Sequence, residues 1–464
     1  MSVGAIAPAE GTPGKRRQPA AYPGYRDSGV AWLGRIPTHW SVRRLKSLAS
    51  VELSNVDKKS VDGEQLVRLC NYLDVYRNER ITSDLDFMVA TATPHQVQRL
   101  SLRAGDVLIT KDSESWTDIA VPAFVATDLT DVLCGYHLAL IRPGKDCEGR
   151  FLVRAFDAAG VREQFRVASN GITRFAVGRD AITSGIFPVP PIEEQRAITV
   201  FLDREIEKID ALVAKKQRLI ALLDERRTAL ITQAVTNGLD PTVQMKESGV
   251  EWSGPVPAHW AVKQVKRLTK APLAYGVLKP DRYEGPDGVR LIRILDVAAG
   301  SVHSQQLERV SPGQSNEYRR TVVAPGDLVI SVVGTIGRCF VVPDSLAGAN
   351  LSRALARIQL RSEVNTRLIE YCLSSEPFLR FTATIPAGTA QRVLNLGDLA
   401  NYTLALPEAP EQGAIVEWLD AQLRSLDALA RRVREAIVRL NELRTALISA
   451  AVTGKIDVRE EAAT

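Results

Sequence analysis

The 464-residue sequence has few cysteines, few aromatic residues and no long apolar run. Its five cysteines lie far apart without a C-x-x-C pair, which argues against a disulfide framework or a zinc site and fits a reducing cytoplasm. The longest apolar runs, such as Phe187–Ile192, are much shorter than a membrane span. The N-terminal residues are small and polar and lack a secretory signal, so residues 1–21 are expected to form a disordered leader.

Three kinds of catalytic motif are also missing. There is no G-x-x-x-x-G-K-[ST] phosphate loop for ATP. There is no Asn/Asp-Pro-Pro-Tyr/Phe tetrapeptide or glycine-rich loop for adenine methylation, and no acidic pair followed by E-x-K for a nuclease. We therefore expect a chain that is not itself an enzyme and that binds no cofactor or metal.

The net charge of +5 neither indicates nor excludes a nucleic-acid partner. The chain is long enough for two or more domains. A DNA-binding face would have to be a local patch on one of them.

An internal repeat dominates the organisation of the chain. Residues 25–48 read YRDSGVAWLGRIPTHWSVRRLKSL, and residues 245–268 read MKESGVEWSGPVPAHWAVKQVKRL, at a constant offset of 220. A second block maps residues 190–240 onto residues 407–457 at an offset of 217 and includes a repeated RTALI. We call these repeated blocks the shared frame. Between them the two halves barely align, which implies one mechanical role and two specificities.

The second shared block has a helical period. Its seam residues recur alternately every three and four residues over four heptads in each copy, which is the coiled-coil pattern. Each segment begins after a proline and ends near Gly238 or Gly454, which predicts long helices over residues 191–237 and 409–454. At 1.5 Å per residue each helix is roughly 65 Å long.

The order of the segments predicts how these helices pair. The second variable segment begins soon after the first helix ends, so the second helix must run back along the first if their seams pair. The predicted fold class is α+β, with two α/β domains separated by an antiparallel two-helix coiled coil in a pseudo-two-fold repeat. The alternative is that each helix packs separately on its own domain. Arg227 and Arg444, at equivalent seam positions, are expected to snorkel or to pair with carboxylates.

The variable segments, residues 41–190 and 261–408, are called the two inserts. They contain short β-like runs, such as Val107–Thr110 and Leu328–Val333. Helical stretches at 150–162 and 365–381 are interspersed, which is typical of α+β domains. In both inserts a Gly-Asp pair is predicted to form a tight turn before a buried strand.

Polar loops of the inserts are the candidate DNA contacts. In the second insert, Gly334 and Gly337 would let the backbone approach a phosphate beside Arg338, although a plain hairpin loop fits as well. Other loops carry side chains that suit base edges, although any exposed loop is polar. The candidate DNA-binding residues are Lys111, Ser113, Asn170, Thr173, Arg174, Gly334, Gly337, Arg338, Thr389, Gln391 and Arg392.

The shared frame also repeats two tryptophans and a histidine. Since they belong to the frame and not to the inserts, we expect them to pack where domain and helix meet. One histidine per repeat, without a carboxylate or cysteine at ligand spacing, is weak evidence for chemistry. These residues are Trp32, His39, Trp40, Trp252, His259 and Trp260.

From Tyr22 to about Asp457 the sequence resembles the specificity subunits of type I restriction–modification systems. The resemblance is carried by the S-G-V-x-W-x-G-x-x-P-x-H-W block, the G-D-[VL]-[LV]-I strand, the P-x-x-E-Q helix entry and the R-T-A-L-I…A-V-T helix end. The first insert departs from the second because it lacks the glycine loop. The helix entry of the second copy is also a variant.

The resemblance implies a role. Each insert would be a target recognition domain that reads half of a bipartite double-stranded DNA site. The helices would fix the gap between the halves and dock two modification (methyltransferase) subunits, and restriction (translocase and nuclease) subunits would join them. These partners would use S-adenosylmethionine, ATP and Mg²⁺, while this chain would be the non-catalytic, cytoplasmic specificity subunit.

Two other functions stay open. A stand-alone DNA-modifying enzyme of unfamiliar motif would bind S-adenosylmethionine by itself. A coiled-coil adaptor without DNA contact would not need two divergent inserts. The predicted boundaries are a leader (1–21), a first target recognition domain (22–190), a first spacer helix (191–237), a linker with repeat frame (238–258), a second target recognition domain (259–408), a second spacer helix (409–454) and a tail (455–464).

Overall fold

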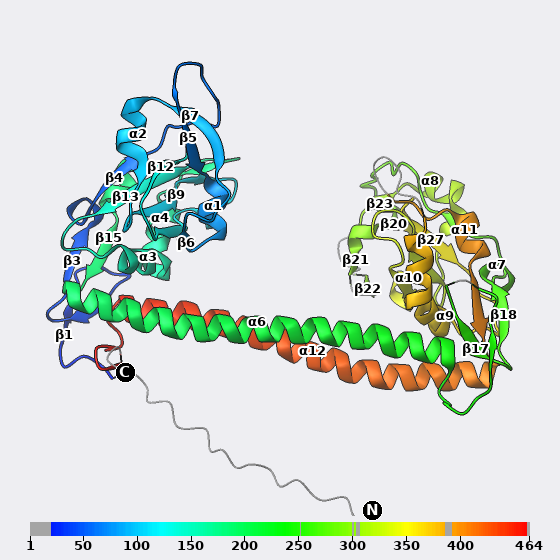
Figure 1. Cartoon of the computed structure of the whole chain (residues 1–464). Helices are drawn as coiled ribbons and strands as arrows, with labels where there is room; N and C mark the ends of the chain where they lie inside the picture. The colour runs from blue at the N-terminus through cyan, green and yellow to red at the C-terminus, as the bar shows by residue number, and fades with distance from the viewer. Residues whose placement is uncertain (1–19, 251, 299–300, 303–306, 386–391, 462–464) are drawn as a thin grey trace, which may run out of the picture. The chain divides into compact units, whose positions relative to one another are not determined.

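The computed structural model describes residues 20–250, 252–298, 301–302, 307–385 and 392–461. The chain divides into two compact units. Unit 1 consists of Met1–Lys215 with Ala436–Thr464, and unit 2 of Lys216–Glu435. Both units combine strands and helices, and each includes a stretch of both long helices (Figure 1).

The long helices are α6 (Ile192–Asn237, 46 residues) and α12 (Ala409–Val452, 44 residues). Each begins directly after a proline or a Pro-Glu pair, and acidic residues in its first turn favour the positive end of the helix dipole. No helix in the described part of the chain has the length and apolarity that a membrane span requires.

Unit 1 contains a five-stranded sheet of order β4-β13-β9-β11-β6 and a four-stranded sheet of order β7-β5-β12-β8. Its strands are β1 (Tyr25–Asp27), β2 (Arg35–Pro37), β3 (Ser41–Arg44), β4 (Ala49–Leu53), β5 (Gln65–Cys70), β6 (Arg80–Ile81), β7 (Met88–Ala92), β8 (Ser101–Leu102), β9 (Val107–Thr110), β10 (Asp112–Ser113), β11 (Pro122–Val125), β12 (Leu129–Cys134), β13 (Leu138–Pro143), β14 (Phe175–Ala176) and β15 (Ile186–Val189). Its shorter helices are α1 (Tyr72–Arg77), α2 (Pro94–Leu100), α3 (Gly149–Asp157), α4 (Ala159–Val167) and α5 (Arg179–Ser184).

Unit 2 contains a four-stranded sheet of order β19-β27-β24-β25 and a three-stranded sheet of order β23-β20-β26. Its strands are β16 (Met245–Glu247), β17 (Pro255–Pro257), β18 (Ala261–Gln264), β19 (Ala274–Tyr275), β20 (Val289–Ile292), β21 (Val297–Ala298), β22 (Ser301–Val302), β23 (Arg309–Val310), β24 (Leu328–Ser331), β25 (Cys339–Val341), β26 (Asn350–Leu351), β27 (Leu355–Ile358) and β28 (Thr403–Leu406). Its shorter helices are α7 (Val265–Leu268), α8 (Pro312–Glu317), α9 (Thr366–Cys372), α10 (Glu376–Ala383) and α11 (Leu396–Asn401).

The predicted buried strands are confirmed, although the second one ends at Ser331 and not at Val333. All residues of β9 and of β24 are buried, as expected of apolar runs that lie inside a sheet and are covered on both faces. The predicted helical stretch 150–162 is not one continuous helix. The backbone of Ala158 is extended and divides the stretch into α3 and α4. The stretch 365–381 is likewise divided into α9 and α10.

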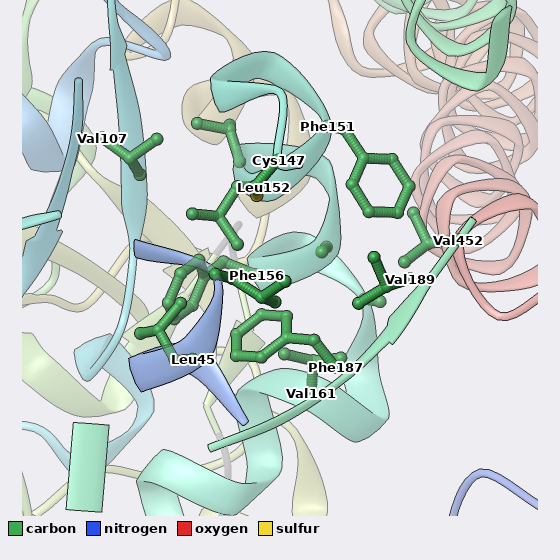
Figure 2. Packing of buried hydrophobic residues seen from close by; sticks show 14 of the residues in the cluster. Leu45, Val107, Cys147, Phe151, Leu152, Phe156, Val161, Phe187, Val189 and Val452 are labelled. Atoms are coloured by element: carbon green, nitrogen blue, oxygen red, sulfur yellow. The ribbon is translucent and has the colours of Figure 1, made fainter. Parts of the chain in front are cut away.

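The core of unit 1 joins its insert to both long helices. Figure 2 shows Phe151, Phe156 and Phe187 pointing into one cluster, with Val452 of α12 beside Val189. Phe156 and Phe187 pack edge to face at 5.1 Å between ring centroids, a favourable aromatic geometry. The same cluster includes apolar residues from the start of α6, namely Ile198, Phe201, Leu202 and Ile206.

The core of unit 2 is built in the same way. It contains Ile231 and Val235 from the end of α6 together with Ile415, Leu419 and Leu423 from the start of α12. Both units thus bury side chains of the two helices in one core. The alternative that each helix packs separately on its own domain does not describe either unit.

The residues after α12 are folded onto the beginning of unit 1. Asp457 forms a β-bridge with Ala20, and the ammonium of Lys455 donates to the carbonyls of Leu33 (3.1 Å) and Arg35 (2.6 Å). The described part of the predicted tail therefore completes the shared frame of unit 1. Residues 1–19 of the predicted leader lie outside the described residues, whereas Ala20 belongs to the fold and not to a disordered leader.

Candidate nucleic-acid interface

A glutamate in the first turn of each long helix fixes the domain to that helix. In unit 1, Glu194 accepts hydrogen bonds from the Trp40 indole (3.0 Å) and the Tyr22 hydroxyl (2.5 Å), and its other oxygen lies 2.8 Å from Nε2 of His39. The indole is buried. Burial, reinforced by Glu194, raises the pKa of the Tyr22 hydroxyl, so this group remains a hydrogen-bond donor at neutral pH.

Unit 2 repeats this arrangement with Glu411. Its carboxylate accepts a hydrogen bond from the Trp260 indole (3.1 Å) and lies 2.8 Å from Nε2 of His259. Packing where domain and helix meet is confirmed for these repeated histidines and tryptophans. Trp252 also packs inside unit 2, where it stacks on Tyr402.

The glutamine of the P-x-x-E-Q motif makes a second connection. The side-chain oxygen of Gln195 accepts the backbone N–H of Glu148, which caps α3, at 2.8 Å. Gln412 accepts the backbone N–H of Asn365, which caps α9, also at 2.8 Å. The motif therefore connects the start of each long helix to the N-terminus of a shorter helix of the same domain, α3 in unit 1 and α9 in unit 2.

The Gly-Asp turns hold a pair that the sequence did not reveal. Asp106 accepts two hydrogen bonds from Arg142 on β13, at 2.9 and 3.0 Å. Asp327 accepts from Arg357 on β27 at 2.7 Å. Gly105, in the first of these turns, has a φ of +92°, which favours glycine. The turns are confirmed, and their aspartates serve the fold.

In the first insert, the pairing of two short strands brings several candidate DNA contacts close together. The strands β10 and β14 pair so that Ser113 lies opposite Phe175, which brings the loop after β9 next to the loop before β14. Ser113 and Arg174 line a cavity of about 720 Å³. Lys111 does not line it, but its ammonium lies 3.0 Å from Asp112 and over the ring of Tyr136.

Asp112 organises the charges beside this cavity. Its carboxylate pairs with Lys111 and with Arg174, whose guanidinium lies 2.9 Å away, and it lies 2.5 Å from Nδ1 of His137. Burial by itself would raise the pKa of Asp112, but the hydrogen bond and charge of Lys111, with His137 and Arg174, lower it. Burial lowers the pKa of His137, although the neighbouring Asp112 carboxylate opposes this shift.

The cavity of the first insert is lined by carboxylates and aromatic rings. Tyr72 and Tyr76, one turn apart on α1, stack at 5.5 Å between ring centroids, and the Tyr72 hydroxyl lies 3.1 Å from that of Ser113. Carboxylates repel phosphates but accept hydrogen bonds from the amino groups of cytosine and adenine. The lining of this cavity is therefore better suited to contact base edges than the phosphate backbone. The acidic lining residues are Asp74, Asp86, Asp112, Glu114 and Asp118.

Two further candidates of the first insert lie on its polar loop. Asn170 forms a backbone bridge with Ala176, and its amide donates to the carbonyl of Ala168. Thr173 is exposed. Neither lines the cavity.

In the second insert, the glycine-rich segment is a hairpin loop between β24 and β25. Gly334 and Gly337 have φ angles of +77° and +90°, which glycine adopts without strain. The backbone N–H of Gly337 donates to the carbonyl of Ser331, and the Ser331 hydroxyl accepts from the backbone of Arg338. The glycines are therefore explained by the turn, and a contact with phosphate stays a prediction.

The two described candidate arginines of the second insert, Arg338 and Arg392, are exposed. Arg338 donates to the carbonyl of Val297 and lines a cavity with residues of α6 and α12. The backbone carbonyl of Arg392 accepts from Gly334, which places Arg392 next to the hairpin loop. The predicted contacts Thr389 and Gln391 lie outside the described residues.

Sequence reasoning missed the partners of the predicted residues. Asp112 on β10, His137 in the turn before β13 and Tyr72 on α1 complete the first cavity, although they are far apart in the sequence. The one local signal was the pair Tyr72 and Tyr76, spaced by one helical turn. Within the described residues, no group of three or more His, Cys, Asp or Glu side chains could hold a metal ion.

The fold is that of a chain in a type I R–M system. A solved structure on the complex assembly and conformational transition of such a system superposes with a TM-score of 0.66 at 19% identity, covering 90% of this chain and 98% of that chain. Residues 296–439 match the family model of the type I restriction modification DNA specificity domain.

Curated relatives point to the same family. The EcoBI specificity subunit of Escherichia coli is 27% identical over 58% of this chain and 58% of its own length. The MjaVIII subunit of Methanocaldococcus jannaschii is 24% identical over 62% of its length, and the EcoKI subunit of Escherichia coli K12 is 22% identical over 90% of its length. The alignments with EcoBI and MjaVIII thus span less than two thirds of those subunits. Over residues 296–439 and along these alignments, the chain is similar to type I restriction enzyme specificity subunits.

Proposed function

We propose that this chain reads a bipartite double-stranded DNA target, one half-site per insert, as the specificity subunit of a type I restriction–modification enzyme. The observation that carries the proposal is a repeated attachment with different loops. Glu194 and Glu411 hold the two domains in the same way. The first insert, however, has an acidic cavity beside Arg174, and the second has a glycine hairpin beside Arg392.

The proposal extends to the long helices. In unit 1 the start of α6 shares a core with the end of α12, and in unit 2 the end of α6 shares a core with the start of α12. Antiparallel pairing of α6 and α12 along their seams satisfies both relationships. The paired helices would separate the two target recognition domains and set the unread gap between the half-sites.

Catalysis would belong to other subunits. Two modification subunits and the restriction subunits would dock on this non-catalytic chain in the cytoplasm and would bind S-adenosylmethionine, ATP and Mg²⁺. The relatives named above are specificity subunits, which supports this division of labour. The chain itself would contribute the choice of DNA sequence.

An exchange of inserts tests the proposal. Residues 41–190 would be replaced by the first insert of another family member, and the methylated motif would be read from genomic DNA. We expect one half of the motif to change while the other half and the gap stay the same. A change in both halves would contradict independent reading.

A gel-shift assay of the full chain, with and without modification subunits, tests the other two functions. A specificity subunit binds its target and methylates nothing alone. Binding of S-adenosylmethionine by the isolated chain would favour a stand-alone enzyme. Absence of any sequence-dependent shift in the assembled complex would favour an adaptor.

A further inference from the structure

The inserts dock on the long helices through matched residues in the two units. Arg150 of α3 pairs with Asp203 of α6, and at the same repeat position Arg367 of α9 pairs with Asp420 of α12. Because the attachment is the same, the surroundings of these contacts can be compared directly.

In unit 1 this docking region includes an arginine whose charge is balanced by a carboxylate of the insert. Arg444 of α12 lies 3.1 Å from the carboxylate of Glu79, which precedes β6 and also pairs with Arg154 of α3. The space left beside Glu79 is a pocket of about 10 Å³. A carboxylate from the insert therefore fills the region.

In unit 2 the matched region is open. Arg227, the repeat equivalent of Arg444, lines a cavity of about 730 Å³ together with Arg338, Arg431 and Arg434, which we call the α12 arginine cavity. Asp427 pairs with Arg227 at 2.6 Å. The other charged lining residues are Asp224, Arg367 and Glu370.

The arginines of this cavity outnumber its carboxylates. Arg367 is paired with Glu370 at 2.7 Å, so the remaining cationic groups are those of the hairpin and of α12. Arg431 and Arg434 are exposed and form no ion pair or hydrogen bond within the described residues. Unlike the small pocket beside Glu79, this cavity presents the unpaired guanidinium groups of Arg431 and Arg434 to an open space, in addition to the carboxylates already named.

We propose that the α12 arginine cavity binds a backbone phosphate of the DNA at the edge of the second half-site. This inference rests on the proposed function. The position of Glu79 in unit 1 indicates that the region accepts an anion. Guanidinium groups bind phosphate through paired, charge-assisted hydrogen bonds, and a phosphodiester offers oxygens to more than one of them.

The neighbouring hairpin favours DNA over an acidic side chain as the occupant. Arg338 belongs to the loop that carries the candidate contacts of the second insert and lines the same cavity as Arg431 and Arg434. A strand whose bases meet this loop would bring its adjacent phosphates to α12. Such a contact would position the duplex without reading its sequence.

The test compares two double variants of equal charge. Arg431→Ala with Arg434→Ala removes the cavity arginines, whereas Arg424→Ala with Arg432→Ala removes two exposed arginines of α12 that do not line the cavity. Binding of the full chain, assembled with its modification subunits, would be measured on a cognate duplex over a series of salt concentrations. Thermal melting would check that both variants are folded.

We expect the cavity variant to bind the duplex about tenfold more weakly, because it loses one or two charge-assisted hydrogen bonds to the phosphate. Its log–log salt slope should become less steep by about one for each lost phosphate contact, without a change of the methylated motif. A double lysine variant, Arg431→Lys with Arg434→Lys, should restore most of the slope because it keeps the charge.

Three outcomes would overturn the proposal. Equal salt slopes for the cavity and control variants would show that no phosphate binds there. Lost assembly of the modification subunits with unchanged DNA binding by the chain itself would assign the cavity to an acidic side chain of a partner. A relaxed second half-site would indicate base reading. Failure of the wild-type complex to bind any duplex would instead contradict the proposed function.

Discussion

Arg142 donates a hydrogen bond to each carboxylate oxygen of Asp106, and the carboxylate is almost completely buried. The same carboxylate accepts the backbone N–H of Arg103, so it closes the turn before β9 and ties that turn to β13. A side chain singled out in a turn motif thus acts as a connection within the sheet.

Replacing this aspartate should destabilise unit 1. Asp106→Ala leaves the Arg142 guanidinium without its partner, and we expect a loss of about 3 kcal/mol in the free energy of unfolding. Urea denaturation of the full chain would measure it. Asp327→Ala is the matched change in unit 2, and Asp131→Ala, which removes an exposed partner of Arg68, is the control with little expected effect.

Loss of the helix-start glutamate should affect the two units unequally. The side chain of Glu194 is 6% exposed and that of Glu411 is 34% exposed. Glu194→Ala leaves the donors of Trp40 and Tyr22 unsatisfied in the core and should cost about 2 kcal/mol. Glu411→Ala should cost clearly less because solvent already reaches the Glu411 carboxylate, so water can take its place beside the Trp260 indole. Equal losses, measured by denaturant unfolding, would contradict a role set by burial.

Stability at acid pH should depend on Asp112. Because the pKa of this carboxyl is lowered in the folded chain, its ion pairs stabilise unit 1 above the pKa of an unfolded aspartate. That contribution is lost as the pH falls through the lowered pKa. Asp112→Asn should therefore be less stable than the wild type at neutral pH and approach it in acid. A constant difference across the pH range would show that charge is not the cause.

Arginines of the two inserts should act on different halves of the target. Arg174→Ala is expected to weaken or relax recognition of the first half-site. Arg338→Ala and Arg392→Ala are expected to weaken DNA binding or to relax recognition of the second half-site. Each change should cost about 1–3 kcal/mol of binding free energy if the arginine contacts bases. The methylated motif and the affinity for duplexes altered in one half would measure this. If affinity and motif were unchanged in all three variants, these arginines would be ordinary solvated side chains.

A heptad removed from each long helix should shorten the unread gap. Seven residues rise about 10 Å, which corresponds to about three base pairs at 3.4 Å each. The seams would stay aligned, so both half-sites should still be recognised with a shorter gap between them. If the domains no longer face one side of the duplex, activity should be lost instead. Removing four residues from each helix should break the seam and the assembly. A heptad variant with the original gap would show that other parts set the spacing.

The sequence predicted what is repeated and periodic. The long helices follow from a seam that continues over four heptads, and the strand β9 follows from four apolar or β-branched residues between turns. The contacts of Arg174 with Asp112 and His137 could not be predicted from the sequence. They depend on the pairing of β10 with β14 and on the turn that leads into β13. The pairing of Asp106 with Arg142 depends in the same way on strand register, for which a single sequence contains no signal.

The bridge between Ala20 and Asp457 has a consequence for how the protein is made. Unit 2 is one continuous stretch of chain, whereas unit 1 needs residues from both sides of it. On a ribosome that adds about 5–20 residues each second, the first insert would emerge well before Ile448 and Val452 are available to cover its core. The domain translated first is therefore completed last, and a nascent or prematurely terminated chain exposes the apolar surface on which α12 finally packs.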